Sequence, residues 1–308
     1  MFARTALASI LLSATAAAQL SIPLGKAPRQ VERPKAPIEE SGPQWAAACK
    51  DWDEWDKPAP PVRIHANTYL VGTCGISAIL IAGEDGHVLI DGGTEAGAEL
   101  IADNIRQLGF RLSDIKYLLM SHEHLDHVGG IARLQQVTGA TLVASAPAEK
   151  VLNTGLPSPD DPQAGMHKPF PAAQVGRVIG DGGDVLIGNI RLFAMTTPGH
   201  TPGALSWRWE SCDGGVCRTI VYADSLSAVS RDDYKFSGHP DYLAAYRASI
   251  AKIAASPCEI LMTPHPSASA MRDRMIGKQP LFDTEGCRNY AAKLTKNLDE
   301  RLAKETAK

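Results

Sequence analysis

The chain has 308 residues, of which 44% are hydrophobic and 21% are charged. This balance is typical of a globular protein with a sizeable core, and the length alone does not decide between one domain and two. Because 31 basic and 34 acidic residues leave a formal net charge of −3 without a long basic run, neither nucleic acid nor a membrane surface is expected as a partner.

The first residues of the chain predict export. Arg4 supplies a positive charge, the stretch 5–18 is apolar and rich in small residues, and residues 16–18 form an A-x-A cleavage site before Gln19. This is the order of a secretory signal peptide, and its apolar part is too short to span a bilayer. We expect residues 1–18 to be removed and the mature protein to be soluble in the periplasm. The alternative is a frayed helix on the mature protein.

Residues 19–43 predict an extended N-terminal arm. They contain five prolines among charges and few large apolar side chains, a composition that does not build a core. The single folded domain is expected over residues 44–308.

From residue 62 onward, strand-like and helix-like segments alternate. Short apolar runs predict strands, and amphipathic runs that end at Gly or begin at Pro predict helices. Strands are expected at 76–81, 87–90, 115–120, 141–144, 185–195 (a hairpin), 204–209, 219–222 and 260–262. Helices are expected at 95–108, 131–137, 239–255 and 287–304. This order predicts an α/β fold, a sandwich of two sheets with its site at the strand ends.

The segment 121–127, Ser-His-Glu-His-Leu-Asp-His, follows a predicted buried strand and carries four potential metal ligands. Imidazoles together with a carboxylate suit zinc, with Zn–N distances near ~2.1 Å. One tetrahedral ion cannot use all four ligands of so tight a turn. We therefore expect two ions, one bound by His122 and His124 and the other by Asp126 and His127. A solvated charged loop is the alternative, and the full motif after a buried strand argues against it.

Two further histidines could each complete one of these ions. His200 and His265 both lie in turns rich in Pro or Gly that follow predicted strands, where a side chain is held in place and accessible. The other histidines lack such a setting and are predicted to be ordinary residues of the surface or of helix starts, namely His65, His87, His167 and His239.

Six cysteines fit an exported protein with disulfides, although six cysteines allow 15 pairings. Cys212 and Cys217 flank a Gly-rich turn between two predicted strands and are expected to pair. A zinc knuckle is disfavoured because no C-x-x-C spacing occurs.

Taken together, these motifs resemble the metallo-β-lactamase superfamily over residues 62–287. Asp91-Gly92-Gly93, the segment 121–127, the loop 198–203 and His265 occur in that family's order. The resemblance implies an αβ/βα four-layer sandwich, with two mixed β-sheets flanked by helices. His127, the segment 222–228 and the segment 71–75 resemble the third subclass of class B β-lactamases.

The resemblance also implies roles for residues of this chain. A first zinc ion would be bound by His122, His124 and His200, and a second by Asp126, His127 and His265. A zinc-bound hydroxide would open the β-lactam amide of penicillins, cephalosporins and carbapenems, which confers antibiotic resistance. Ser225 and Ser227 would bind the substrate carboxylate, Asp91 would orient the ligand segment, and the protein would act as a monomer. The cysteines resemble those of the Adelaide imipenemase type, which implies the pairs Cys49–Cys74, Cys212–Cys217 and Cys258–Cys287.

Two other functions remain open. Glyoxalase II thioesterases and the lactonases of the superfamily bridge both metals with an aspartate, a role that a one-residue shift would give to Asp224. Those enzymes usually lack a signal peptide and the run 224–228, Asp-Ser-Leu-Ser-Ala. A non-enzymatic periplasmic zinc-binding protein is disfavoured, because no flexible His-rich tract occurs.

Overall fold

The computed structural model describes residues 38–307. The expected signal peptide and residues 19–37 of the expected arm lie outside this range. Within the described range, none of the helices combines the length and the apolar character that crossing a membrane requires.

The N-terminal half of the chain forms a seven-stranded mixed sheet. Strands β1 to β4 pair antiparallel, and β4 to β7 pair parallel. In spatial order the strands are β1 (Val62–His65), β2 (Thr68–Leu70), β3 (Ile79–Ala82), β4 (His87–Ile90), β5 (Ile115–Leu119), β6 (Thr141–Ala144) and β7 (Val175–Val178).

The C-terminal half forms a second mixed sheet of five strands. Here β11 and β12 pair parallel, and the other neighbours pair antiparallel. The spatial order is β12 (Ile260–Met262), β11 (Val216–Tyr222), β10 (Leu205–Asp213), β9 (Ile190–Thr196) and β8 (Asp184–Ile187).

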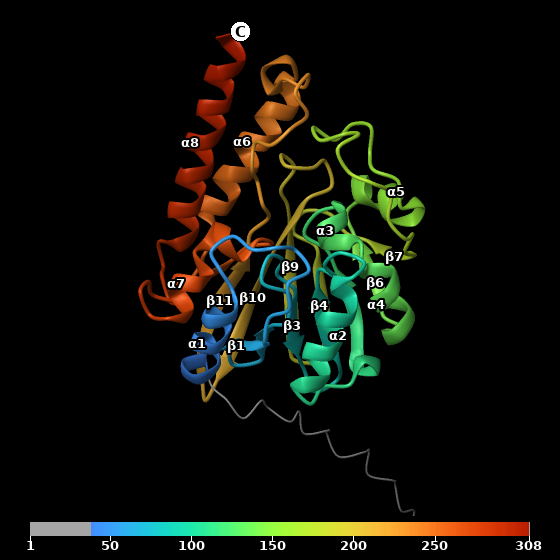
Figure 1. The fold of residues 1–308 in the computed structure, drawn as a ribbon, viewed down its shortest axis with the longest axis vertical. Coiled ribbons are helices and arrows are strands. Elements are labelled where there is room, and N and C mark those ends of the chain that lie inside the picture. Colours follow the sequence, from blue (N-terminus) through green and yellow to red (C-terminus); the bar gives the residue numbers. More distant parts are fainter. Residues whose placement is uncertain (1–37, 308) are drawn as a thin grey trace, which may run out of the picture.

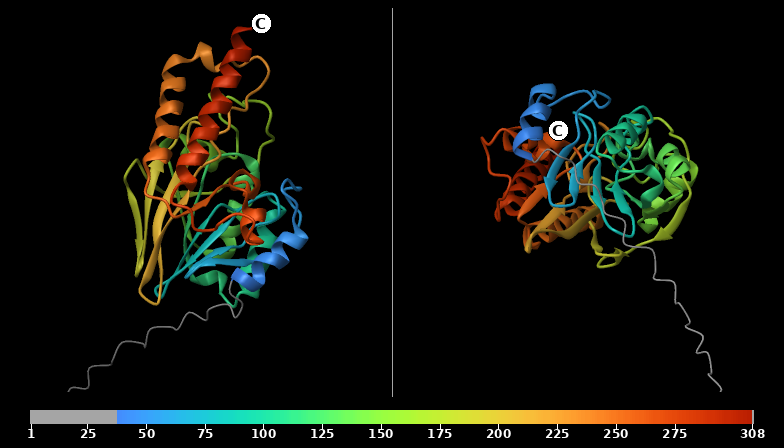
Figure 2. Two further views of the ribbon diagram at one scale, coloured as in Figure 1. Left: turned by 90° about the vertical axis from the view of Figure 1, so that its left-hand side faces the viewer. Right: turned by 90° about the horizontal axis from the view of Figure 1, so that it is seen from below.

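Helices cover the outer face of each sheet, which gives four layers (Figures 1 and 2). On the first sheet lie α2 (Gly97–Gln107), α4 (Ile131–Thr138) and α5 (Ala146–Thr154); on the second lie α6 (Pro240–Ala255) and α8 (Gly286–Thr306). Successive residues of β3 and β4 point alternately into the core between the sheets and into the core under the helices. Both faces are therefore buried, which explains why these strands appear as continuous apolar runs. The predicted αβ/βα sandwich is confirmed.

The prediction of an extended arm over residues 19–43 is wrong in part. Residues 38–43 belong not to an extended arm but to helix α1 (Ile38–Ala48), which contains Pro43. The side chain of Trp45 is 1% exposed and packs into the core between the sheets. Burial of so large an apolar surface outweighs the cost of a proline within the helix.

The six cysteines form three disulfides: Cys49–Cys74, Cys212–Cys217 and Cys258–Cys287. These are the pairs that the family resemblance implied. Cys212 and Cys217 stand directly opposite each other in the β10–β11 hairpin, as their turn predicted.

Candidate metal centre

Three loops bring all six predicted ligands together at one edge of the two sheets. Residues 121–127 follow β5 and enter the short helix α3 (Leu125–Val128), beside the strand ends in Figure 1. His200 lies in the turn between β9 and β10, and His265 follows β12. Five of the six side chains are buried, while the side chain of His265 is 21% exposed and so gives access to the site.

The ligand atoms form compact groups. Those of His122, His124 and His200 lie within 4.8 Å of one another, and so do those of His122, Asp126 and His127. The Nε2 atom of His265 adds to the second group, 3.4 Å from His127 Nε2 and 3.5 Å from Asp126 Oδ2. Two ligands of a tetrahedral zinc ion lie about 3.4 Å apart when each bond is ~2.1 Å. Donor types and spacing therefore suit zinc.

Four of the histidines are held by an acceptor at one ring nitrogen. The pairs are His122 Nδ1 with Asp224 Oδ1 (2.9 Å), His124 Nε2 with Asp161 Oδ2 (2.8 Å), His200 Nδ1 with Ser227 O (3.0 Å) and His265 Nδ1 with Gly75 O (3.2 Å). A ring that donates from one nitrogen keeps a lone pair on the other for a metal. His122 Nε2 is buried and has no hydrogen-bond partner among the described residues. Such an atom fits a site built for a metal ion.

Asp91 forms hydrogen bonds with the first residue of the ligand segment. Its carboxylate accepts hydrogen bonds from Ser121 N (2.6 Å), Ser121 Oγ (2.7 Å) and Tyr222 OH (2.7 Å). The same carboxylate lies 3.7 Å from His127 Nδ1, on the side of that ring away from Asp126. Asp91 also has a φ of +64°, a conformation that is costly for a residue with a side chain and that clusters at functional sites.

Glu123 was not predicted to take part in the site. Its buried side chain accepts hydrogen bonds from Thr201 Oγ1 (2.6 Å) and Gly203 N (2.8 Å). Burial raises the pKa of Glu123. Glu123 therefore ties the 121–127 segment to the loop that carries His200, an interaction for which the sequence offers no signal.

The contribution of the loop between α5 and β7 to the site was also not predicted from the sequence. Its Asp161 accepts from His124 Nε2 and from Gln163 N (2.7 Å), and the Gln163 side-chain nitrogen lies 3.4 Å from His200 Nε2. The His167 ring stands 4.2 Å from that of His124. The prediction that His167 is an ordinary surface residue is therefore wrong, because the loop folds back over the first ligand group.

His87 also differs from its prediction as a surface residue or helix start. It is 5% exposed in β4, and its ring lies 5.0 Å from that of Phe110. Its Nδ1 accepts from Gly83 N at 3.2 Å. This histidine is therefore part of the core under α2.

The three polar residues 224, 225 and 227 occupy different positions. Asp224 is fully buried, bonded to His122 Nδ1, and belongs to neither ligand group. The Ser225 hydroxyl is buried without a hydrogen-bond partner among the described residues. The Ser227 hydroxyl lies 3.0 Å from His200 Nδ1. Asp224 thus supports a ligand, while Ser225 keeps a free hydroxyl.

The electrostatics of the cluster keep most of these ligands ready for a cation. Burial, with the neighbouring imidazoles, holds the pKa of His122 well below its usual range and lowers the pKa of His200 to about 3 and of His265 to about 4. Burial acts to raise the pKa of Asp126, but His127 outweighs it and holds that pKa below its usual range. His122, His200 and His265 are thus neutral and Asp126 is anionic, the protonation states that metal binding requires. His127 differs: burial acts to lower its pKa, but Asp126 and Asp91 outweigh burial and raise it to about 10, so this ring must release a proton when a metal binds.

The metal-free chain is expected to lose stability as the pH falls from 6.5 towards 4. In this window the unfolded chain protonates His122, His200 and His265, whose ordinary pKa is 6.5, while the folded chain keeps them neutral. These three histidines outnumber Asp224 and Glu123, whose pKa values burial raises and which act in the opposite sense. The unfolded state therefore binds more protons, and the free energy of unfolding decreases as the pH decreases. Thermal unfolding after chelator treatment should show a lower midpoint at pH 5 than at pH 7. Equal midpoints would contradict this account of the cluster.

The Metallo-beta-lactamase superfamily model matches residues 71–265. Among solved structures, the MIM-2 metallo-beta-lactamase is 55% identical with a TM-score of 0.83, covering 86% of this chain and 98% of that one. MEM-A1, a subclass B3 metallo-beta-lactamase from a soil metagenome library, is 43% identical with a TM-score of 0.78, covering 82% of this chain and 99% of that one.

The curated relatives match a smaller part of the chain. The hydroxyacylglutathione hydrolase of Ectopseudomonas mendocina is 29% identical over 146 residues, which cover 47% of this chain and 44% of that protein. The chain therefore spans less than half the length of this relative.

Proposed function

Because this chain belongs to the metallo-beta-lactamase superfamily, we propose that it is a di-zinc β-lactamase of subclass B3. Its substrates would be penicillins, cephalosporins and carbapenems, and its product the ring-opened acid. This activity would confer antibiotic resistance. The MIM-2 enzyme, at 55% identity over 86% of the chain, supports this substrate class more strongly than the hydroxyacylglutathione hydrolase does.

The position of Asp224 is the observation that carries the proposal. In the rival function, a glyoxalase II-like thioesterase or a lactonase, Asp224 would bridge both metals. Its Oδ1 instead lies 2.9 Å from His122 Nδ1, while His122 Nε2 is left free for a metal. An aspartate that binds the far nitrogen of a ligand ring orients that ligand and does not bind the metal itself. The six predicted ligands, His122 included, are then divided between two ions.

In the proposed enzyme, His122, His124 and His200 would hold the first ion, and Asp126, His127 and His265 the second. Bound zinc would lower the pKa of a water molecule to near ~7 and polarise a carbonyl oxygen. The chain's own contribution is orientation, since Asp224, Asp161, Ser227 O and Gly75 O each fix one histidine ring.

Ser225 is proposed to bind the substrate carboxylate through its hydroxyl, which is buried without a partner among the described residues and would turn towards the substrate on binding. Ser227 would help as a polar neighbour, although its hydroxyl already contacts His200. Beside His265, the Trp52 ring is 73% exposed and lies 6.2 Å from the His265 ring. An exposed indole in this position offers an apolar wall to the substrate.

Elemental analysis tests the metal assignment. Six ligands of the right type divide into two sets of three, so we expect about two zinc ions per chain at saturation. One tightly held iron, or no metal after purification in the presence of zinc, would contradict the assignment.

Export to the periplasm is a further part of the proposal. The A-x-A site at residues 16–18 and the three disulfides both suit an oxidising compartment. The mass of periplasmic protein should correspond to a chain that begins within a few residues of Gln19. An intact Met1 on cytoplasmic protein would exclude export.

A further inference from the structure

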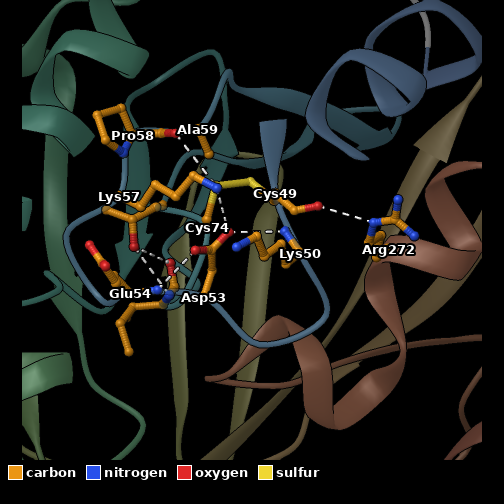
Figure 3. The surroundings of a disulfide bond; sticks show 12 residues. Cys49, Lys50, Asp53, Glu54, Lys57, Pro58, Ala59, Cys74 and Arg272 are labelled. Carbon is orange, nitrogen blue, oxygen red and sulfur yellow. Dashed lines mark hydrogen bonds and ion pairs between the residues drawn. A yellow bond between two sulfur atoms is a disulfide. The ribbon is translucent and has the colours of Figure 1, made fainter. Parts of the chain in front are cut away.

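The Cys49–Cys74 disulfide (Figure 3) is next in sequence to Gly75, whose carbonyl oxygen contacts His265. Cys49 follows the end of α1, and Cys74 belongs to the segment 71–77 that precedes β3. Both half-cystines are buried, at 2% and 3% exposure, in the core between the sheets. Nothing in the zinc chemistry proposed above uses this disulfide.

The residues just after Cys74 hold the His265 loop directly. Gly75 O lies 3.2 Å from His265 Nδ1, so this carbonyl fixes the ring and leaves Nε2 for the metal. Ser77 N donates to Pro264 O (2.7 Å), and Ser77 Oγ donates to Thr263 O (2.8 Å). Three consecutive residues of the ligand loop are therefore bound to the segment that the disulfide anchors.

The position of Gly75 leaves little room for adjustment. A Cβ atom at this residue would lie 2.7 Å from both Asp53 O and Glu54 O. Cys74 N donates to Lys57 O at 2.9 Å (Figure 3). The loop 53–57, which begins four residues after Cys49, therefore packs closely against Gly75 and limits its movement.

The other half-cystine contacts the far side of the same loop. Cys49 O accepts from Arg272 Nε at 3.0 Å (Figure 3). Arg272 belongs to the short helix α7 (Met271–Met275), which follows the turn after His265. The disulfide therefore joins two segments. One, residues 71–77, contacts His265 and the two residues before it, and the other, at Cys49, contacts helix α7 just after the His265 loop.

We infer that the Cys49–Cys74 disulfide positions Gly75 O against His265 and thereby sets the affinity of the second metal site. The inference rests on the proposed di-zinc function. Without the disulfide, the segment 71–77 can move away from the His265 loop, and the ring loses its fixed orientation. Loss of an outer partner of a metal ligand typically lowers metal affinity ~10–100-fold, so the second ion should bind about tenfold more weakly while the first is unchanged.

The test compares two pairs of cysteine variants in the full-length protein. Cys49→Ser with Cys74→Ser removes this disulfide without leaving a thiol that could bind zinc. Cys212→Ser with Cys217→Ser is the matched control, because that disulfide lies at the tip of the β10–β11 hairpin, at the end of β10 opposite to the turn that carries His200. Stepwise zinc affinities come from competition with a chromogenic chelator. We expect about a tenfold weaker second ion in the first variant and two unchanged ions in the control.

A double-mutant cycle identifies the ion that is affected. In a His265→Ala background, the disulfide should no longer influence the ion that remains. Ser77→Ala removes one bond to the ligand loop while the disulfide stays, and it should weaken the second ion in the same direction. If the serine variant does not fold, Cys49→Ala with Cys74→Ala decides the question, because it removes the disulfide without placing hydroxyl groups in the core between the sheets.

Unchanged affinity for the second ion in a folded variant that lacks the Cys49–Cys74 disulfide, with serine or alanine at both positions, would overturn the inference. Equal weakening of both ions, or equal weakening in the hairpin control, would overturn it as well, because either result means general loosening. A wild-type protein that binds fewer than two zinc ions would refute the proposed function instead.

Discussion

His122→Ala is expected to abolish β-lactam hydrolysis and to remove the first zinc ion. His122 is the one residue that belongs to both compact ligand groups, and it is fully buried. Its loss takes a ligand from the site and leaves Asp224 without the ring it supports. Because outer partners alone are worth ~10–100-fold, loss of the ligand itself should lower kcat/KM by more than about 100-fold. Steady-state hydrolysis of a cephalosporin and elemental analysis measure the two effects.

His239→Ala is the matched control for this variant. His239 is exposed, stacks on Tyr234 at 4.5 Å and contacts no ligand. It should keep both ions and full activity. A His122→Ala protein that retained two zinc ions and near-normal turnover would refute the ligand assignment.

Asp224→Ala is expected to weaken the first ion about 10- to 100-fold and to spare the second. The reason is that Asp224 orients His122 and belongs to neither ligand group. Asp224→Asn should recover most of the affinity, since an amide oxygen can still accept from His122 Nδ1. If Asp224 bridged both ions, as in the thioesterase function, Asp224→Ala would lose both together. Zinc titration of the three proteins separates these outcomes.

Ser225→Ala provides the contrast within the same loop. It should keep both zinc ions and mainly raise KM. One hydrogen bond to a substrate is worth ~0.5–1.5 kcal/mol, or about 2- to 12-fold, and somewhat more when the partner is a charged carboxylate. Loss of metal from Ser225→Ala would mean that this hydroxyl supports the metal site and not the substrate.

The six candidate ligands, which the structure brings together, could be identified in the sequence because each has a strong local signal. His122, His124, Asp126 and His127 lie within six residues after a buried strand, and His200 and His265 lie in turns where Pro or Gly restricts the backbone. The strand ends of an α/β sheet meet at one edge, so these signals could be combined without knowledge of the contacts.

The residues behind the ligands could not be predicted in the same way. Asp161 lies 37 residues from His124 in sequence, in a long loop without periodic pattern, and Glu123 points away from the metal-binding atoms towards Thr201. Such contacts depend on how a loop folds over the sheet edge, which local patterns do not encode. Helix α1 was missed for a related reason, since burial of Trp45 against distant strands overrides the prolines nearby.

The disulfides could be predicted from the sequence only in part. Only Cys212–Cys217 could be derived from spacing, because a tight hairpin brings its two arms into register. The partners in Cys49–Cys74 and Cys258–Cys287 are 25 and 29 residues apart, and family resemblance alone indicated them.

The most direct test of the central claim is a comparison of two substrates in one purified sample. Hydrolysis of a chromogenic cephalosporin and of S-lactoylglutathione is measured before chelation, after chelation and after zinc is restored. A subclass B3 β-lactamase should open the cephalosporin rapidly, lose that activity with the chelator, regain it with zinc and leave the thioester nearly untouched. A protein inert towards every β-lactam that cleaves the thioester would contradict the account.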